Sequence, residues 1–486
     1  MATLSHLEPT GIWQHFEAIC QIPRPSKKEG KITKYLTDFA ERLNLEWQQD
    51  SAGNVIIRKP ATSGFENKPW VVLQSHVDMV CEKNSDIKHN FDKDPIIPVI
   101  KGDWVHALGT TLGADNGIGM AAQLAILEAT DIDHGPIECL FTVDEETGLT
   151  GAFRLEKDFV KSRILLNLDS EDDGELFIGC AGGIDTTATF SYKNVEPLAD
   201  QVFLKVAVTG LTGGHSGDDI NKGRGNAIKI ITRLLWNFEK MFEIRLSEIS
   251  GGNLRNAIAR EAFATFSTPK RYKPSLIALV KDLVSEIKLE LKSTEPNLNI
   301  DLAETIQTSH LIDLETQQNL LNALYACPHG VISMSPDISN LVETSTNLAS
   351  IKMTPTDIII ATSQRSSLES GKQNVADMVN AVFSLAGAKI KTGDGYPGWR
   401  PNVNSPIMAT MKEAHKKLFG VEPKVLAIHA GLECGQIGEK YPGIDMISYG
   451  PTIKGAHSPD ERIHIPAVKK FWKLTLETLK MIPARK

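Results

Sequence analysis

The chain has 486 residues, of which 41% are hydrophobic and 23% are charged, and its formal net charge is −8. This length is too great for one ordinary domain and predicts two. Lysine and arginine are scattered, which excludes the dense basic surface typical of nucleic-acid-binding proteins. The sequence shows neither a signal peptide nor the roughly 18 consecutive apolar residues of a membrane span. Composition therefore predicts a globular cytoplasmic protein without nucleic-acid or membrane partners.

Cysteine usage agrees with that compartment. Six cysteines are spread along the chain without a Cys-x-x-Cys pair: Cys20, Cys81, Cys139, Cys180, Cys327 and Cys434. This pattern suits a reducing environment and indicates buried free thiols, rather than a disulfide framework or a cysteine zinc site.

The first third of the chain alternates helical and strand patterns. Residues 12–44 have the pattern of two helices, and a tight glycine-rich loop at 113–117 leads into an apolar helix at 118–129. Short apolar runs of strand length occupy 71–73, 137–143 and 164–168. Strands that alternate with helices predict an α/β fold around a parallel or mixed sheet.

The pattern changes after residue 183. Residues 202–208 alternate apolar and polar side chains, as a half-exposed strand does, and a helix is predicted at 226–240. A similar order returns with strands near 351 and at 357–362, a helix at 375–386 and a last strand at 388–391. We therefore predict an inserted α+β domain at 185–395, built of two weakly related halves.

The remaining segments, 1–184 and 396–486, are predicted to form one discontinuous catalytic domain. The second segment contributes a helix at 406–418 and a strand at 445–448.

Acidic and histidine side chains follow the predicted strands of this domain. They are His76 and Asp78, Glu145 and Glu146, Asp169, and, further along, His457; Asp115 lies in the glycine-rich loop. Open α/β sheets build their sites at the carboxyl ends of strands. Clustered carboxylates repel one another unless a cation holds them, and imidazole and carboxylate are ligands of zinc. Each element alone is more often a solvated turn, but the ordered set predicts a site for two metal ions.

Five segments of the chain resemble the motifs of the M20 metallopeptidases, in the same order. They are SHVDMV at 75–80, GADNG at 113–117, DEETG at 144–148, NLD at 167–169 and HSPDE at 457–461. Further segments resemble the branch of this family that hydrolyses Xaa-His dipeptides: GGHSG at 213–217, NLRNAI at 253–258, SQRSS at 363–367 and HAGLECG at 429–435. The resemblance covers nearly the whole chain. One departure is Ala259, where proline is usual in the family, and it removes no ligand.

The resemblance implies a zinc-peptidase-like catalytic domain with a central mixed sheet and an inserted lid. It assigns one metal ion to His76, Asp115 and Asp169, and a second to Asp115, Glu146 and His457. Asp78 would fix the tautomer of His76 through a hydrogen bond. Glu145 would act as the general base. The family also has a cis peptide after its bridging aspartate, here between Asp115 and Asn116.

The resemblance also implies substrate contacts. His215, which could otherwise be a solvated loop histidine, would donate to the oxyanion of the tetrahedral intermediate. Arg365, which could otherwise be a surface arginine, would bind the substrate carboxylate. Asn256 and Glu433 are further substrate-binding candidates, with Glu433 facing the substrate amine.

The implied activity is hydrolysis of unblocked dipeptides, including Xaa-His dipeptides such as β-Ala-His. Two divalent metal ions would activate the water; zinc, manganese and cobalt all suit these nitrogen and oxygen ligands. A deacylase or a tripeptidase would use the same metal set. A non-catalytic metal-binding scaffold is the alternative outside enzymes, and the presence of Glu145 beside complete ligands argues against it. The resemblance leaves open whether His215 acts in its own chain or across a homodimer.

Overall fold

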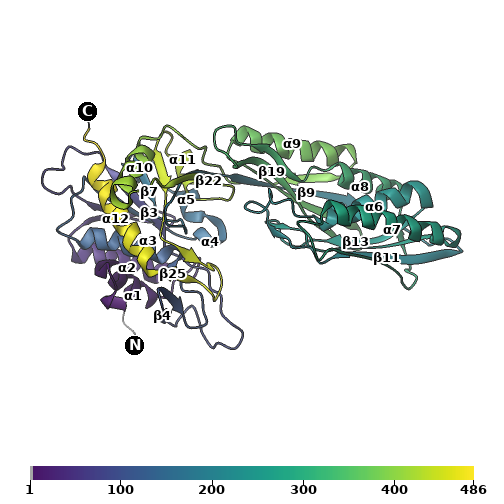
Figure 1. Ribbon diagram of the computed structural model, residues 1–486, viewed down its shortest axis with the longest axis horizontal. Coiled ribbons are helices and arrows are strands. Elements are labelled where there is room, and N and C mark those ends of the chain that lie inside the picture. The colour runs from purple at the N-terminus through teal and green to yellow at the C-terminus, as the bar shows by residue number, and fades with distance from the viewer. Residues whose placement is uncertain (1–3, 486) are drawn as a thin grey trace. The chain divides into compact units, whose positions relative to one another are not determined.

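A computed structural model of the chain describes residues 4–485 and divides it into two compact units (Figure 1). Unit 1 contains the chain up to Cys180, Trp399–Ala427 and the chain from Leu432 onward. Unit 2 contains Ala181–Gly398 and the short segment Ile428–Gly431. None of the helices within residues 4–485 has the length and apolar character that a membrane crossing requires.

Unit 1 is built on an eight-stranded mixed sheet with the order β1-β2-β6-β3-β7-β23-β8-β22. In chain order the strands are β1 (Glu46–Gln49), β2 (Val55–Lys59), β3 (Val71–His76), β6 (Ile137–Thr142), β7 (Ile164–Asn167), β8 (Glu175–Cys180), β22 (Lys424–Ile428) and β23 (Asp445–Ser448). The central strands β6, β3, β7 and β23 run parallel. The pairs β1–β2, β2–β6 and β23–β8 are antiparallel. Every residue of β3 and β6 is buried, which explains their nearly continuous apolar sequences.

A smaller four-stranded antiparallel sheet, β24-β25-β5-β4, completes the strands of unit 1. Its members are β4 (Pro98–Lys101), β5 (Trp104–Ala107), β24 (Ile453–Lys454) and β25 (Arg462–His464). It brings a segment near residue 100 beside one near residue 460, and so places two distant parts of the sequence side by side.

Unit 1 also contains a short 3-10 helix and eight α-helices within the described chain. They are η1 (Leu4–His6), α1 (Thr10–Cys20), α2 (Gly30–Arg42), α3 (Ala114–Glu128), α4 (Glu145–Gly148), α5 (Thr150–Arg154), α10 (Pro406–Phe419), α11 (Cys434–Lys440) and α12 (Ile465–Met481). Helix α3 packs between β3 and α1 and is buried from Asn116 to Leu127. Its first turn is irregular, because Asp115 and Asn116 have non-helical backbone angles.

Unit 2 is built on a nine-stranded antiparallel sheet with the order β16-β11-β15-β13-β19-β20-β9-β21, and β18 also pairs with β19. Its strands are β9 (Gly182–Ser191), β11 (Gln201–Thr209), β13 (Arg245–Gly251), β15 (Ala262–Pro269), β16 (Asn299–Glu304), β18 (Gly330–Met334), β19 (Val342–Met353), β20 (Asp357–Ser366) and β21 (Lys389–Thr392). The β13 and β19 portions join through a single pair, Gly251 opposite Ile351.

The helices of unit 2 lie along one side of this sheet (Figure 1). They are α6 (Ala227–Phe242), the 3-10 helix η2 (Lys270–Tyr272), α7 (Lys273–Glu290), α8 (Leu314–Ala326) and α9 (Glu369–Leu385). Two short ladders pair β10 (Asn194–Val195) with β17 (Leu311–Ile312) and β12 (Gly214–His215) with β14 (Ala257–Ile258), and β17 and β14 contact β13 and β19 of the main sheet. Helix α6 buries the apolar face that its sequence presents: Ile230, Ile231, Leu234, Leu235 and Phe238.

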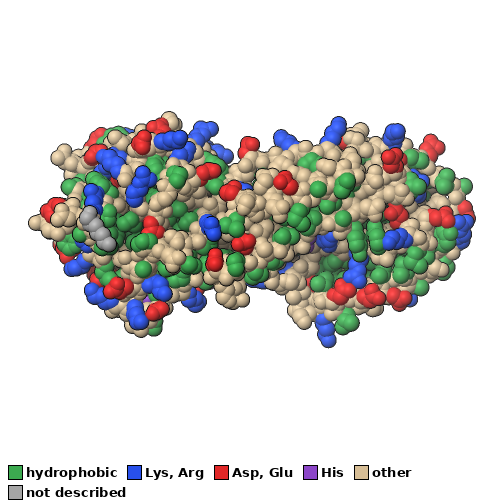
Figure 2. All heavy atoms as spheres, turned by 90° about the horizontal axis from the view of Figure 1, so that it is seen from above, with side chains coloured by type: hydrophobic (Ala, Val, Ile, Leu, Met, Phe, Trp, Pro, Cys, Tyr) green, Lys and Arg blue, Asp and Glu red, His purple; other side chains and the backbone are tan. Residues whose placement is uncertain are grey.

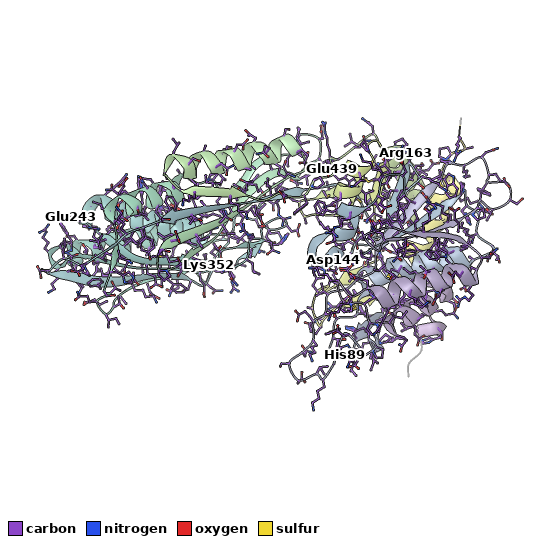
Figure 3. All side chains as sticks on the ribbon, turned by 180° about the vertical axis from the view of Figure 1, so that it is seen from behind. His89, Asp144, Arg163, Glu243, Lys352 and Glu439 are labelled. Atoms are coloured by element: carbon purple, nitrogen blue, oxygen red, sulfur yellow. The ribbon has the colours of Figure 1, made fainter. Side chains whose placement is uncertain are left out.

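The surface carries charge of both signs. On the face shown in Figure 2, lysine and arginine are interspersed with aspartate and glutamate. Figure 3 shows the side chains of both units, with Asp144 marking the turn after β6 in unit 1 and Lys352 marking β19 in unit 2.

The structure confirms the predicted α/β class with a central mixed sheet and a separate sheet-and-helix unit. Some boundaries differ. Helix α9 begins at Glu369 rather than 375, because its first turn is polar and lacks apolar periodicity. The sequence analysis identified no element after 448, yet α12 buries Val468, Phe471 and Leu474 at helical spacing.

Candidate metal centre

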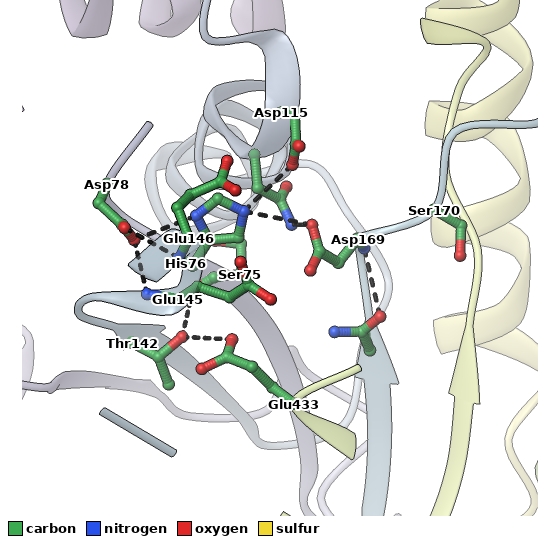
Figure 4. Close-up of polar contacts among 12 residues, drawn as sticks. Ser75, His76, Asp78, Asp115, Thr142, Glu145, Glu146, Asp169, Ser170 and Glu433 are labelled. Atoms are coloured by element: carbon green, nitrogen blue, oxygen red, sulfur yellow. Dashed lines mark hydrogen bonds and ion pairs between the residues drawn. The ribbon is translucent and has the colours of Figure 1, made fainter. Parts of the chain in front are cut away.

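The metal-ligand candidates of unit 1 lie at one edge of the mixed sheet (Figure 4). Strand β3 ends at His76, β6 ends three residues before Glu145, and β7 ends two residues before Asp169. These strands are parallel neighbours, so their carboxyl ends meet at the same edge. The irregular turn that opens α3 adds Asp115, and His457 follows β24.

Four groups of three side chains within residues 4–485 have the spacing of metal ligands, and Asp115 belongs to two of them. The other two groups are His76 with Glu145 and Glu146, and Glu29 with Asp78 and Asp144. In one of the groups that contain Asp115, His76 Nε2 lies 3.1 Å from Asp115 Oδ1 and 3.5 Å from Asp169 Oδ1. In the other, His457 Nε2 lies 3.1 Å from Asp115 Oδ2 and 3.1 Å from Glu146 Oε2. The ligand atoms within each group all lie within 4.8 Å of one another. Oδ1 of Asp115 thus belongs to the group with His76, and Oδ2 belongs to the group with His457.

The electrostatics of these groups fit bound cations. Hydrogen bonds to Asp115 and Glu146 raise the pKa of His457 to about 11. Burial opposes charge on His76, but Asp169 and the other carboxylates around it raise its pKa well above the ordinary value. Burial likewise opposes charge on Asp115, and the two imidazoles outweigh it and lower the pKa of Asp115. The carboxylates therefore hold protons on the imidazoles, at positions where metal ions would supply the positive charge.

A second observation supports the fit. Glu146 Oε1 is buried and accepts no hydrogen bond from any residue in the range 4–485. An unpaired buried carboxylate oxygen is costly unless a cation completes it. With nitrogen and oxygen donors from both histidines and three carboxylates, the residues present suit two divalent ions.

Asp78 supports the site from behind. One of its oxygens lies 3.3 Å from His76 Nδ1 and also accepts the N–H of Glu145 at 3.0 Å; its other oxygen accepts the N–H of Glu146 at 3.2 Å. Ser26 donates a further hydrogen bond at 2.7 Å. Although burial disfavours its charge, these donors lower the pKa of Asp78 to about 2. Asp78 thus holds the turn that carries both glutamates and places a carboxylate oxygen close to Nδ1 of His76.

Glu145 occupies a different environment from its neighbour. Burial, followed by Asp169, Glu433 and Glu146, raises the pKa of Glu145 well above its ordinary value, and His76 only partly opposes this. A carboxyl group with a raised pKa is suited to taking up and releasing a proton.

Glu433 lies beneath this centre and is fully buried. Its Oε2 accepts hydrogen bonds from Gln74 Nε2 at 2.6 Å and Thr142 Oγ1 at 2.7 Å, as Figure 4 shows for Thr142. Burial raises the pKa of Glu433 to about 7.

Three further predicted site residues belong to unit 2. His215 lies in β12, with Nδ1 3.3 Å from the N–H groups of Gly217 and Asp218 and 3.3 Å from the Asp218 carboxylate. Arg365 lies in β20, is 7% exposed, and its Nε has no hydrogen-bond partner within residues 4–485. Asn256 is exposed, and its carbonyl accepts the N–H of Ser216 at 2.8 Å.

The sequence analysis did not assign roles to several residues around the centre. Asn116 donates to Asp169 Oδ1, and the peptide between Asp115 and Asn116 is cis. Arg24 and Glu461 bind the backbone of the loop before Asp115. Asn116 and Glu461 lie inside the motifs quoted above, so their position was available as a signal, whereas Arg24 lies outside all of them.

Comparison with known proteins agrees with this geometry. The sequence profile of peptidase family M20/M25/M40 matches residues 72–481. The chain is 44% identical to the cytosol non-specific dipeptidase of Escherichia coli (strain K12), over 100% of both chains. It is 45% identical to the solved structure of aminoacylhistidine dipeptidase from Vibrio alginolyticus, with a TM-score of 0.94 and 99% of each chain covered.

A more distant structure shares the fold. The aminopeptidase PepT from Bacillus cereus is 17% identical, with a TM-score of 0.58, over 98% of this chain and 99% of that one. The matches confirm the family resemblance carried by the five sequence motifs: the chain belongs to peptidase family M20/M25/M40.

Proposed function

We propose that this protein is a cytosolic, metal-dependent dipeptidase that hydrolyses unblocked dipeptides, Xaa-His dipeptides among them. The single observation that carries the proposal is the pair of ligand groups that share Asp115. Support for the substrate class comes from the two full-length relatives, one named a cytosol non-specific dipeptidase and the other an aminoacylhistidine dipeptidase. Unit 1 would be the catalytic domain, and unit 2 a substrate-binding lid domain.

The metal ligands would be divided between two ions. His76, Asp115 and Asp169 would hold one, and Asp115, Glu146 and His457 the other; zinc is the first candidate, and manganese or cobalt would also fit. When bound, two divalent ions polarise the scissile carbonyl and favour ionisation of a water molecule. Asp78 would keep the Nδ1 proton of His76 in place, so that Nε2 is the coordinating nitrogen.

Proton transfer would belong to Glu145. It would take a proton from the attacking water and pass it to the departing amine nitrogen. The raised pKa of Glu145 supports this role, because a base must also be able to act as an acid in the second step. The backbone N–H of Glu145 donates to Asp78, and this hydrogen bond fixes the position of the Glu145 backbone.

The remaining substrate contacts are proposed from chemistry. Arg365 would bind the substrate carboxylate, since a buried guanidinium with an unpaired Nε has a donor to offer. His215 is anchored through Nδ1, and its other nitrogen would donate to the developing oxyanion. Asn256 would add a polar contact, and Glu433 would attract the substrate amine.

A rate panel on metal-loaded and metal-stripped protein tests the proposal. We expect free dipeptides such as β-Ala-His to be cleaved well, and tripeptides and N-acylated amino acids poorly. Stripping with a chelator should abolish hydrolysis, and zinc, manganese or cobalt should restore it. Full activity in protein shown to be metal-free would contradict the mechanism, and a preference for N-acylated amino acids would identify a deacylase instead.

A matched pair of variants localises the effect. His457→Asn removes a proposed ligand and should weaken metal binding. His310→Asn changes an exposed histidine of unit 2 in the same way and should leave metal binding unchanged.

A further inference from the structure

The loop that carries Asp115 is held by two buried charged side chains from distant parts of the sequence. Glu461 is 2% exposed, and Arg24 is 3% exposed. Within residues 4–485, both side chains form their hydrogen bonds with backbone groups. A buried charge is costly unless polar groups compensate it, and here the compensating groups belong to the backbone of one loop and the segment beside it.

Glu461 accepts the N–H groups of four consecutive residues. Oε2 receives Leu112 at 2.7 Å and Gly113 at 2.9 Å, and Oε1 receives Ala114 at 2.7 Å and Asp115 at 3.2 Å. These N–H groups open an irregular turn, so the helix cannot satisfy them itself. A carboxylate is the acceptor that such a row of donors favours.

Arg24 holds the same loop from its carbonyl side. Its Nη2 donates to the Gly113 carbonyl, and its Nη1 donates to the carbonyls of Val77 and Asp78. The guanidinium therefore joins the segment after β3, which carries His76, to the loop before Asp115. Gly113 is held on both sides, by Glu461 at its N–H and by Arg24 at its carbonyl. Its φ of 66° suits glycine, and a Cβ there would lie 2.5 Å from Arg24 Nη2.

The same contacts also reach the second histidine. Glu461 is four residues after His457, and its own N–H donates to Ser458 at 3.0 Å, which closes a turn beside that ligand. The carboxylate that holds the Asp115 backbone thus belongs to the turn that carries His457. Because each Asp115 oxygen faces a different histidine, a small rotation of this loop would lose one of the two contacts.

We infer that Arg24 and Glu461 are positioning residues that fix the backbone of Asp115 between His76 and His457, and that assembly of the two-metal centre depends on them. The inference rests on the proposed function of that centre. A residue supporting a metal ligand typically contributes about 10- to 100-fold to metal affinity.

The test is a cobalt titration of metal-free protein, followed by the visible absorption of the bound ion. Glu461→Gln replaces one accepting oxygen with an amide NH2 group, which is itself a donor and would face two backbone N–H donors. We expect cobalt affinity to fall about 10- to 100-fold, with an altered absorption spectrum. Arg24→Lys keeps the charge but cannot bridge the two loops, so it should change affinity and spectrum in the same direction. Glu461→Asp, which keeps the carboxylate, should restore part of the affinity.

The matched control is Glu138→Gln. Glu138 is a fully buried carboxylate of unit 1 that accepts the N–H groups of Lys161 and Ser162 and pairs with Arg58. The same substitution there should lower thermal stability and leave cobalt affinity and spectrum unchanged. A folded Glu461→Gln protein with wild-type affinity and spectrum would overturn the inference.

Hydrogen exchange on the metal-free wild type decides the question if the variants do not fold. The amides of Leu112 to Asp115 should be protected without metal, because Glu461 already holds them. Exchange at the rate of an unstructured loop would refute the positioning role. If the wild type binds no cobalt while those amides are protected, the proposed function fails and the positioning of the loop stands.

Discussion

Two adjacent glutamates show how environment separates chemical roles. The backbone N–H groups of Glu145 and Glu146 both donate to the Asp78 carboxylate, so the backbones of the two residues are held in the same way. Their side chains differ. Glu146 Oε2 lies 3.1 Å from His457 Nε2. Glu145 instead has a raised pKa, because burial and the neighbouring carboxylates disfavour its charged form. The first environment suits coordination and the second suits proton transfer, although an oxygen of Glu145 also lies at ligand spacing from His76 and Glu146.

This difference predicts opposite effects of one substitution at neighbouring positions. Glu145→Gln should retain both metal ions and lose kcat by about 10²- to 10⁴-fold, because it removes proton transfer alone. Glu146→Gln should instead lower metal occupancy, because a coordinating oxygen is lost. Metal content by elemental analysis, read beside kcat at saturating metal, separates the two.

Glu477→Gln provides a control, since Glu477 pairs with Lys417 on the surface of unit 1. It should change neither quantity. If Glu145→Gln lost metal and Glu146→Gln kept it, the two roles would have to be exchanged.

At the scale of elements, the ends of the parallel strands made the site predictable. Acidic and histidine residues that directly follow buried strands must meet at one sheet edge if the strands are parallel neighbours. His76, Glu146 and Asp169 follow this rule, and the structure brings them to one edge. The order of the sheet was not predictable, because β23, which pairs with β7, comes from a segment almost 300 residues later.

The motif at 457–461 marks the position of Glu461, but the roles of Arg24 and Glu461 could not be predicted from the sequence, for a physical reason. Arg24 and Glu461 act through hydrogen bonds to backbone groups, and backbone groups carry no sequence signal at the partner's end. A lone arginine near Pro23 and Pro25, or a glutamate in a polar turn, reads as a solvated side chain until the fold is known.

In unit 2, two side chains form hydrogen bonds with strand β19 where the neighbouring strands do not pair with it. On one edge of β19, pairing with β18 ends at Thr346 and pairing with β13 occurs only at Ile351. Between them, the N–H of Leu348 donates to His329 Nδ1 at 3.3 Å, and its carbonyl accepts from Asn226 Nδ2 at 2.8 Å. Asn226 also caps α6, so the helix and the strand share one residue.

His329 should make the stability of the protein depend on pH. Burial, and then Lys229, lowers the pKa of His329 to about 4. In the unfolded chain a histidine titrates near 6.5. As pH falls below that value, the unfolded state binds the proton first, so stability decreases down to about pH 4. At pH 5 the loss from this half-buried group would be at most about 2 kcal/mol relative to pH 8.

His329→Asn keeps an acceptor for Leu348 and removes the titration. Urea unfolding at pH 8 and pH 5 should therefore show a smaller loss of stability in the variant than in the wild type. The exposed His310→Asn should leave the loss unchanged. Equal losses in wild type and His329→Asn would show that His329 is not the titrating group.

At the scale of the molecule, the functional candidates are divided between the two units. The chain passes from one unit to the other after residues 180, 398, 427 and 431. The predicted metal ligands, Asp78 and Glu145 belong to unit 1, whereas His215, Asn256 and Arg365 belong to unit 2. Under the proposed function, the residues of the metal centre and Glu433 would come from unit 1, and the other substrate-binding residues from unit 2.

That division predicts that substrate length is read by Arg365. A dipeptide carries a free carboxylate one residue beyond the scissile bond, and amidation removes that charge. Arg365→Ala should reduce kcat/KM for the free dipeptide by about 30-fold to several thousand-fold, as deletion of one partner of a buried charge pair costs about 2–5 kcal/mol. Part of the loss should appear in kcat, because the contact also positions the carbonyl. The kcat/KM for the amidated dipeptide, already a poor substrate, should be affected little.

Arg271→Ala changes an exposed arginine of the same unit and should leave kcat/KM for both substrates unchanged. Equal losses on the free and the amidated dipeptide would mean that Arg365 does not bind the carboxylate, and the preference for dipeptides would then have to come from other residues.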